Sequence, residues 1–260
     1  MEHQALLENY LKQLHLSTFI HNYQAYASDA ARTDLPYERY LLALCSAEVT
    51  QRDALRVERA IAQARFPVMK DLSTFDFSAV QNISKQLVLE LAQGGYMASA
   101  ETIILIGGPG LGKTHIATGL ALAACKQGKR VRFFSANNLV NDLLSAQKDL
   151  RLSKLLTQFV KLDLVVLDEL GFIPFREDGA QLLFQLCSDL NERVSIIVTT
   201  NLRFGEWNQV FREEKMTAAL LDRLTHKAHI LEFVGESYRF RQRLLQEEQQ
   251  TPGESKQDAG

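Results

Sequence analysis

Long apolar runs are absent from this 260-residue sequence, and none approaches the roughly 18 residues that a membrane-spanning helix needs. The N-terminus has no basic stretch followed by an apolar one, so no secretion signal is expected. Cysteine is scarce. The three cysteines, Cys45, Cys125 and Cys187, are odd in number and lack CxxC spacing, which argues against a disulfide framework and a zinc site. We therefore expect a cytoplasmic protein with reduced, buried thiols.

An excess of positive charge is also lacking. The 29 lysines and arginines against 31 aspartates and glutamates give a formal net charge of −2, so any affinity for nucleic acid must come from a local patch. The 14 glycines and 5 prolines are too few for a fibrous protein. With 46% hydrophobic and 23% charged residues, the composition indicates a globular protein.

Apolar residues recur at three- and four-residue spacing up to about residue 65, which predicts helices. We interpret residues 1–66 as a small all-helical N-terminal domain that binds DNA or a partner. Residues 67–78 break the helical period and are expected to form a connector. Residues 247–260 are polar with little to bury, and are predicted to be a disordered tail.

Between residues 79 and 246, short apolar runs alternate with helical patterns. Alternating strands and helices, with strands that are apolar on both faces, predict an α/β fold whose parallel sheet is covered by helices on both faces. The strands are expected at 102–106, 131–135, 162–167, 195–200 and 229–233, and the helices at 114–126, 137–147, 178–192, 216–224 and 237–249.

The segment after the first of these strands matches the phosphate-binding pattern GxxxxGK[ST]. Its glycines let backbone N–H groups wrap closely around a phosphate. Lys113 supplies positive charge to the β- and γ-phosphates, and Thr114 offers a hydroxyl to Mg²⁺ at a helix N-terminus, which itself favours an anion. The preceding strand and the following helix are the context that this motif requires. The predicted nucleotide-binding residues are Gly107, Gly108, Pro109, Gly110, Leu111, Gly112, Lys113 and Thr114.

A second apolar strand ends in two carboxylates, Asp168 and Glu169. Because a strand places neighbouring side chains on opposite sides, the two acids can take different tasks. Asp168 is predicted to hold Mg²⁺ through water, and Glu169 to polarise the water that attacks the γ-phosphate. The alternative interpretation is that both acids are ordinary surface residues that follow a strand. Next to a phosphate-binding loop, the pair favours a hydrolase over a small-molecule kinase or a GTPase, with ATP and Mg²⁺ as cofactors.

Three more polar residues are predicted to complete the catalytic site with Lys113 and Glu169. Asn201 follows the strand expected between the other two and is suited to orient the water, although an ordinary turn asparagine is the alternative. Arg223 closes a helix, where any cation is favourable, but is interpreted as an arginine finger for ATP on the next subunit. Arg239 opens the last helix and is expected to contact the γ-phosphate in its own subunit, with Arg241 as the alternative.

A basic segment runs from residue 126 to residue 161, with eight lysines and arginines against two aspartates, or +6. Such a patch suits contacts with the phosphate backbone of DNA. A stripe of arginines in the N-terminal domain suits the same role. Solvated helical faces are the alternative for both. The predicted DNA-binding residues are Lys148, Arg151 and Lys154 in the segment, and Arg52, Arg56 and Arg59 in the stripe.

Several motifs together resemble the AAA+ ATPases of the IstB/DnaC group, and within it the IstB-like transposition helper ATPases. The resemblance covers about residues 5–245, and Arg203 stands where the family pattern usually has proline. It is carried by ARFP (64–67), FDFS (75–78), GGPGLGKTHIA (107–117), LDELGF (167–172), TTNLRFGEW (199–207), LLDRLTHKAHILEF (220–233) and GESYRFR (235–241).

The resemblance implies a P-loop AAA+ fold of the additional-strand, catalytic-glutamate class. It further implies an oligomer with ATP sites at subunit interfaces, assembled on duplex DNA, that assists a transposase in target selection and insertion. A helicase loader of the DnaC kind, acting on a replicative helicase, shares the same core and is the first alternative. A nucleotide-gated DNA-binding module without turnover is the second, and a small-molecule kinase is disfavoured because no substrate or lid segment is visible.

Overall fold

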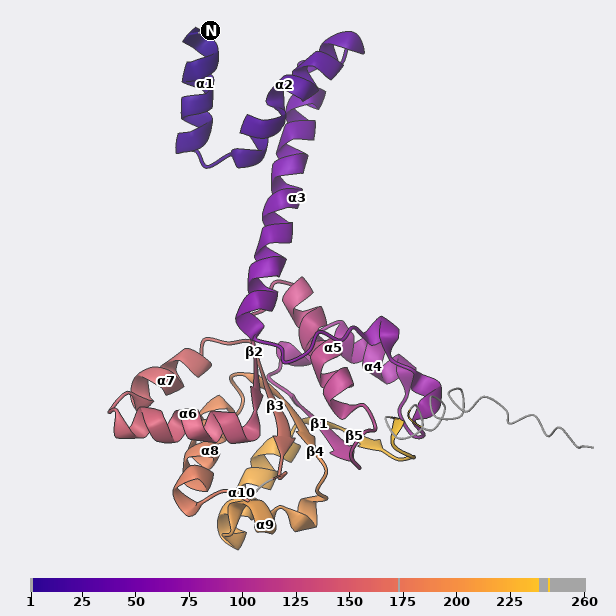
Figure 1. Ribbon diagram of the computed structural model, residues 1–260, viewed down its shortest axis with the longest axis vertical. Coiled ribbons are helices and arrows are strands. Elements are labelled where there is room, and N and C mark those ends of the chain that lie inside the picture. Colours follow the sequence, from indigo (N-terminus) through magenta and orange to yellow (C-terminus); the bar gives the residue numbers. More distant parts are fainter. Residues whose placement is uncertain (1, 173, 239–242, 244–260) are drawn as a thin grey trace, which may run out of the picture. The chain divides into compact units, whose positions relative to one another are not determined.

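The computed structural model describes residues 2–172, 174–238 and 243, and divides the chain into two units, one ending at Arg59 and one beginning at Ala60 (Figure 1). Most of the helix predicted at 237–249, including Arg239 and Arg241, lies outside the described residues, as does the tail 247–260. Among the described helices, none combines the length and apolarity that a membrane crossing requires.

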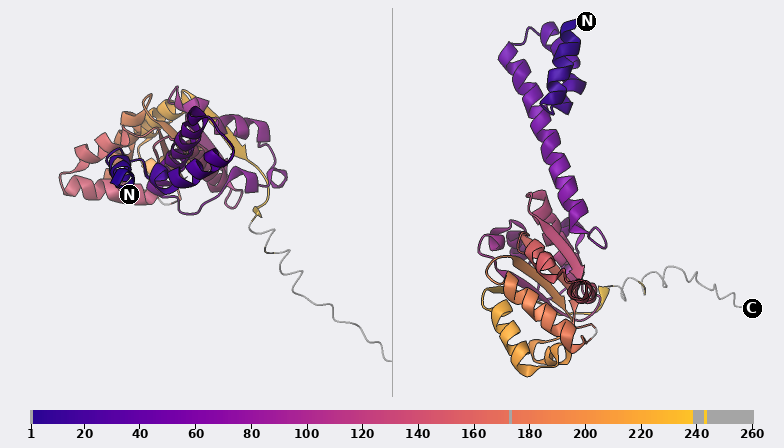
Figure 2. Two further views of the ribbon diagram at one scale, coloured as in Figure 1. Left: turned by 90° about the horizontal axis from the view of Figure 1, so that it is seen from above. Right: turned by 90° about the vertical axis from the view of Figure 1, so that its left-hand side faces the viewer.

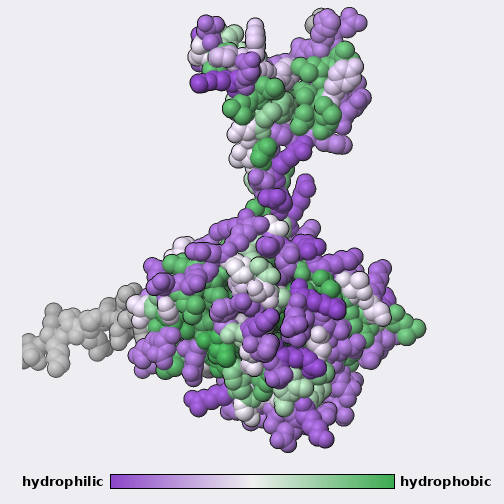
Figure 3. Space-filling view, turned by 180° about the vertical axis from the view of Figure 1, so that it is seen from behind, coloured by the Kyte–Doolittle hydropathy of each residue, from purple (hydrophilic) through white to green (hydrophobic). Residues whose placement is uncertain are grey.

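Helices make up the N-terminal unit, as the sequence predicts. They are α1 (Glu2–Gln13), α2 (Ser17–Arg32) and the part of α3 (Tyr37–Ala64) that reaches Arg59. Apolar side chains remain exposed on this unit, and they gather on its surface in Figure 3. The apolar face seen in the sequence is therefore only partly buried within the unit. These exposed side chains are Leu6, Leu7, Tyr10, Leu14, Leu35, Tyr37, Leu41, Leu42 and Val49.

A buried carboxylate joins α3 to α2. Glu48 on α3 is only 5% exposed and accepts hydrogen bonds from Thr18 N at 2.9 Å and Arg52 Nε at 2.6 Å. Burial alone raises the pKa of Glu48, but the hydrogen bonds from Arg52 and Thr18 outweigh it and leave the pKa lowered. Arg52 Nη2 also donates to His15 O at 2.7 Å. Arg52, predicted as a DNA contact, thus holds the α1–α2 turn against α3.

The second unit contains a five-stranded parallel sheet in the order β2-β3-β4-β1-β5. Because β4 lies between β1 and β3, the strand that precedes Asn201 lies between the strand before the phosphate-binding loop and the strand that carries Asp168, as predicted. The strands are β1 (Thr102–Gly107), β2 (Val131–Ser135), β3 (Leu164–Leu170), β4 (Ser195–Thr200) and β5 (Ala228–Phe233).

Four of the helices in this unit confirm predicted ones: α5 (Lys113–Lys126), α6 (Ala136–Lys148), α8 (Glu177–Leu190) and α10 (Glu214–Thr225). Three more were not expected: α4 (Lys85–Ala92), α7 (Leu152–Phe159) and α9 (Asn208–Phe211). Each has eight residues or fewer, so its sequence contains too few turns for a clear period. Single 3₁₀ turns occur at η1 (Leu72–Thr74), η2 (Phe77–Ala79), η3 (Gly95–Met97) and η4 (Phe204–Glu206).

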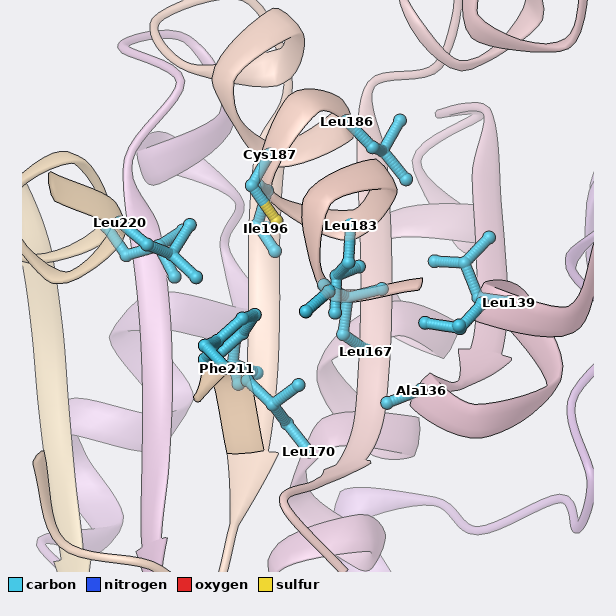
Figure 4. Packing of buried hydrophobic residues seen from close by; sticks show 14 of the residues in the cluster. Ala136, Leu139, Leu167, Leu170, Leu183, Leu186, Cys187, Ile196, Phe211 and Leu220 are labelled. Atoms are coloured by element: carbon cyan, nitrogen blue, oxygen red, sulfur yellow. The ribbon is translucent and has the colours of Figure 1, made fainter. Parts of the chain in front are cut away.

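Helices cover both faces of the sheet (Figure 2), and successive residues of each strand point to opposite faces. Along β1, Ile103 and Leu105 pack with residues of α4 and α5, whereas Ile104 and Ile106 pack with residues of α6, α8 and α10. Figure 4 shows the second face, where Leu167 and Ile196 lie among helical side chains. The sheet is therefore a rigid support for the loops at its edges.

Two of the three cysteines agree with the expectation of buried thiols. Burial raises the pKa of Cys125 to about 11 and that of Cys187 to about 12, so both thiols stay protonated at neutral pH. The expectation is wrong for Cys45 on α3, which is exposed. Its neighbour Leu44 occupies the buried position instead.

Candidate nucleotide-binding site

The phosphate-binding loop connects the end of β1 to the start of α5, as its motif predicts. Gly107 has φ +152°, and a Cβ there would collide with Phe233 O of the neighbouring strand. Gly112 has φ +91°, and a Cβ there would lie 2.5 Å from Phe75 Cε2. Lys113 Nζ donates to the carbonyl oxygens of Gly107 and Gly108, both at 2.7 Å. Two carbonyl groups of the loop thus hold the ammonium group of Lys113. The loop lies beside the N-terminus of α5, where an anion is favoured.

The predicted magnesium residues lie together. Thr114 Oγ1 donates to Asp168 Oδ1 at 2.9 Å and to Oδ2 at 3.2 Å, although the two residues are 54 positions apart. Asp168 is 6% exposed and also accepts a hydrogen bond from Thr199 Oγ1 at 2.6 Å. A hydroxyl and a carboxylate are hard oxygen donors, the kind that Mg²⁺ prefers. The residues present therefore fit that ion.

A cavity of about 430 Å³ lies beside this pair, within the size range of small-molecule sites. Its wall brings together the loop residues 109–115 with the predicted catalytic residues Glu169 and Asn201. The remaining residues come from other parts of the unit, namely Lys70, Thr74, Phe75, Asp76, Ala79, Val80, Phe172, Thr199, Thr200 and Tyr238.

Part of the segment predicted as a connector forms one wall of this cavity. Phe75 packs edge-on against the His115 ring, with centroids 5.2 Å apart. His115 Nε2 lies 2.9 Å from Asp71 O and 3.2 Å from Thr74 Oγ1. Asp71 also forms an ion pair with Lys126 at 2.8 Å. The segment is therefore fastened along α5, and the sequence reasoning did not assign its residues to the site.

The carboxylate of Asp71 is stabilised in its charged form. A hydrogen bond from Lys126, with further ones from Ser73, holds the pKa of Asp71 well below its usual range. The FDFS motif at 75–78, one of those that carry the family resemblance, was a sequence signal that could have drawn attention to this segment. Its two aromatic rings pack edge-on with centroids 4.8 Å apart.

Arg223 lies away from this cavity. It stacks over the Phe184 ring of α8, 5.0 Å from the centroid, and its Nη1 donates to Ala219 O at 3.3 Å. It is not part of the cavity wall formed by the described residues of its own chain. Its predicted role toward ATP on the next subunit stays a prediction, as does that of Arg239, which lies outside the described residues.

The predicted DNA-binding residues differ in their partners. Arg151 forms an ion pair with Asp149, and Arg56 with Asp53 at 3.2 Å, so part of their charge is compensated. For Lys148, Lys154 and Arg59, no ion pair occurs within the described part of the chain. Their contact with DNA stays a prediction.

A family model described as "IstB-like ATP binding protein" matches residues 9–246. The chain belongs to this family. Relatives named for insertion sequences and ATP binding are similar over most of their length. A protein of insertion sequence IS5376 from Geobacillus stearothermophilus is 34% identical over 244 residues, which cover 94% of this chain and 97% of the relative. A protein of insertion sequence IS21 from Pseudomonas aeruginosa is 34% identical over 237 residues, which cover 91% of this chain and 89% of the relative.

Solved structures show the fold of this IstB-like chain. A crystal structure of DnaI has a TM-score of 0.54 at 17% identity and covers 64% of this chain and 91% of its own. DnaA from Aquifex aeolicus, solved with bound AMPPCP, has a TM-score of 0.57 at 18% identity. The match covers 71% of this chain and 55% of the DnaA chain. The α/β unit thus has the P-loop AAA+ fold that the sequence predicted. The chain therefore belongs to a family described by ATP binding, and the role of the cavity beside the phosphate-binding loop as the ATP site stays a prediction.

Replacing Gly107 with alanine is expected to weaken ATP binding by about tenfold or more, because strain at a positive φ and the collision with Phe233 O would deform the loop. Titration with a fluorescent ATP analogue measures the affinity. Gly205→Ala is the matched control, since a Cβ there meets nothing within 4 Å and its affinity should stay near that of the wild type. Equal affinities for both variants, with unchanged thermal unfolding, would contradict the assigned role of Gly107.

Proposed function

We propose that this IstB-like protein is a Mg²⁺-dependent ATP hydrolase that assembles on duplex DNA and assists a transposase in target selection and insertion. The convergence of Thr114, Asp168, Glu169 and Asn201 beside the phosphate-binding loop carries the proposal of hydrolysis. A binding module without turnover would need the loop but not a carboxylate in position to polarise water.

Each residue of the site has a distinct task in the proposed reaction. The amide groups of the loop and Lys113 bind the β- and γ-phosphates. Thr114 and Asp168 would hold Mg²⁺, which would supply positive charge against the phosphate oxygens. Glu169 orients the attacking water and accepts its proton. Asn201, at the end of the neighbouring strand, also holds that water in position. Catalysis therefore depends on placing two carboxylates and an amide around one phosphate.

The proposed partner is a transposase, and the names of the relatives support this choice over a replicative helicase, because they refer to insertion sequences. The structural likeness to DnaI and DnaA concerns the fold alone. We propose that the helical N-terminal domain contacts DNA or the transposase, with the domain limits given above. Self-assembly with ATP at subunit interfaces would give a role to Arg223, which is not part of the cavity wall in its own chain.

Glu169→Gln is expected to bind ATP normally but to lower its hydrolysis by about a hundredfold or more, because the amide cannot act as a general base. Lys113→Ala is expected to lose ATP binding, because the phosphates lose their nearest cation. Steady-state hydrolysis and analogue titration separate the two effects. Glu177→Gln, an exposed glutamate at the start of α8, is the control. Hydrolysis at the wild-type rate by Glu169→Gln would refute the role of this carboxylate.

Arg223→Ala is expected to lower hydrolysis by about a thousandfold if the arginine serves ATP on a neighbouring subunit. Mixing it with Lys113→Ala should restore part of the activity, because the second variant supplies Arg223 to the intact ATP site of the first. Each variant alone at the same total concentration is the control. No recovery in the mixture, together with a monomeric protein in ATP and DNA, would exclude an intersubunit finger.

Replacing Lys148, Arg151 and Lys154 by alanine should weaken binding to every duplex sequence about equally, because the contacts are expected at phosphates. Each lost contact should flatten the fall of log affinity with log salt by about 0.9. Titrations at several salt concentrations measure the slope. A second variant replaces Arg52, Arg56 and Arg59, and its effect should add to the first.

The matched control for the DNA experiment replaces Arg193, Lys215 and Lys227, three exposed cations of the α/β unit outside the basic segment. It should leave the salt slope unchanged. Because Arg52 also holds the α1–α2 turn, thermal unfolding of the second variant shows whether its effect comes from lost folding. Unchanged slopes in both test variants would mean that other residues bind the duplex.

A further inference from the structure

The pairing of β3 with β4 is irregular where the two carboxylates lie. Leu167 pairs with Val198, but the next pair is Leu170 with Thr200. Asp168 and Glu169 on β3 therefore face a single residue of β4, Thr199, which is the arrangement of a β-bulge. Bulges redirect side chains and are frequent next to active sites.

The side chain of Thr199 occupies the bulge. Thr199 is 1% exposed, and its Oγ1 accepts a hydrogen bond from Glu169 N at 2.9 Å. The same oxygen donates to Asp168 Oδ1 at 2.6 Å. One hydroxyl thus joins the backbone of one acid to the side chain of the other. The hydrogen bond is part-buried, and an N–H shielded from water without a partner is unfavourable, so this contact stabilises the backbone at Glu169.

The backbone at Glu169 is in a strained conformation. Its φ is +60°, a region that residues other than glycine, asparagine and aspartate seldom adopt. Such a conformation persists only where surrounding contacts hold it. In a regular strand, Glu169 would point to the face opposite Asp168. Here Glu169 lines the cavity, and Asp168 contacts Thr114 beside it.

We propose that Thr199 is the positioning residue of the hydrolytic site: its buried hydroxyl fixes the bulge that presents Glu169 to the cavity while holding Asp168 toward Thr114. This inference rests on the proposed function, in which Glu169 polarises water. It assigns Thr199 no part in binding the nucleotide. Loss of the hydroxyl should therefore slow turnover and leave ATP affinity intact.

The test compares Thr199→Val, which removes the hydroxyl at nearly constant volume, with Thr199→Ser, which keeps it. The valine variant should lower kcat by about tenfold or more, because Glu169 would lose the contact that holds it in position to polarise the water. Its affinity for a fluorescent ATP analogue should stay within about twofold of the wild type. The serine variant should restore most of the rate. In the Glu169→Gln background, adding the valine should cause little further loss.

Thr118→Val is the matched control. Thr118 lies on α5 and is 1% exposed, and its hydroxyl has no hydrogen-bond partner among the described residues, so valine should change neither rate nor affinity. Hydrogen exchange at the Glu169 amide gives a readout that does not depend on activity. The amide should exchange faster in Thr199→Val than in the wild type, Thr199→Ser or Thr118→Val.

The outcomes separate this inference from the proposed function. If the wild type hydrolyses ATP and Glu169→Gln does not, a wild-type kcat for Thr199→Val overturns the positioning role alone. A parallel loss of ATP affinity, or a Glu169 amide that stays protected, overturns it as well. A wild-type chain without hydrolysis in the presence of Mg²⁺ and DNA overturns both. If Thr199→Val does not fold, Thr199→Ala is measured in the same way.

Discussion

The carboxyl ends of β1, β3 and β4 share one edge of the sheet, because the three strands are parallel and β4 lies between the other two. The site depends on this constraint. It places the phosphate-binding loop, the two carboxylates and Asn201 next to one another although they are far apart in sequence. The strands are buried on both faces, so their ends have little freedom to move. Ligands of open parallel sheets bind at such edges for the same reason.

The motifs predicted a large part of this arrangement, because each consists of local sequence with a fixed structural context. A glycine loop between an apolar strand and a helix admits few conformations, and two carboxylates after a strand identify its exposed end. The place of the strand before Asn201, between the other two strands of the site, followed from the same motifs. The sheet confirms this placement of β4, and Thr114 at the start of α5 forms a direct hydrogen bond with Asp168 on β3.

Features that depend on contacts between distant residues were not predictable. LVVLDEL has the pattern of a regular strand, and the bulge at Asp168 and Glu169 becomes evident only from its pairing with Thr199. The wall at Phe75 depends on His115, forty positions away. Similarly, Arg52 has the spacing of a solvated cation, but the buried Glu48 makes it part of the N-terminal unit. In each case a tertiary partner determines what the local sequence leaves open.

The positive charges around the proposed ATP site bear on how hydrolysis would depend on assembly. Among the described residues of its wall, Lys70 and Lys113 are the lysines and no arginine is present, whereas the transition state of phosphoryl transfer spreads negative charge over three oxygens. Arg223 has its guanidinium stacked on Phe184, which orders the side chain before any contact with nucleotide. If Arg223 serves ATP on the next subunit, as proposed, it would add positive charge to that site, and hydrolysis would depend on assembly. Because DNA binding would bring subunits together, turnover would then begin only on DNA, where the proposed function needs it.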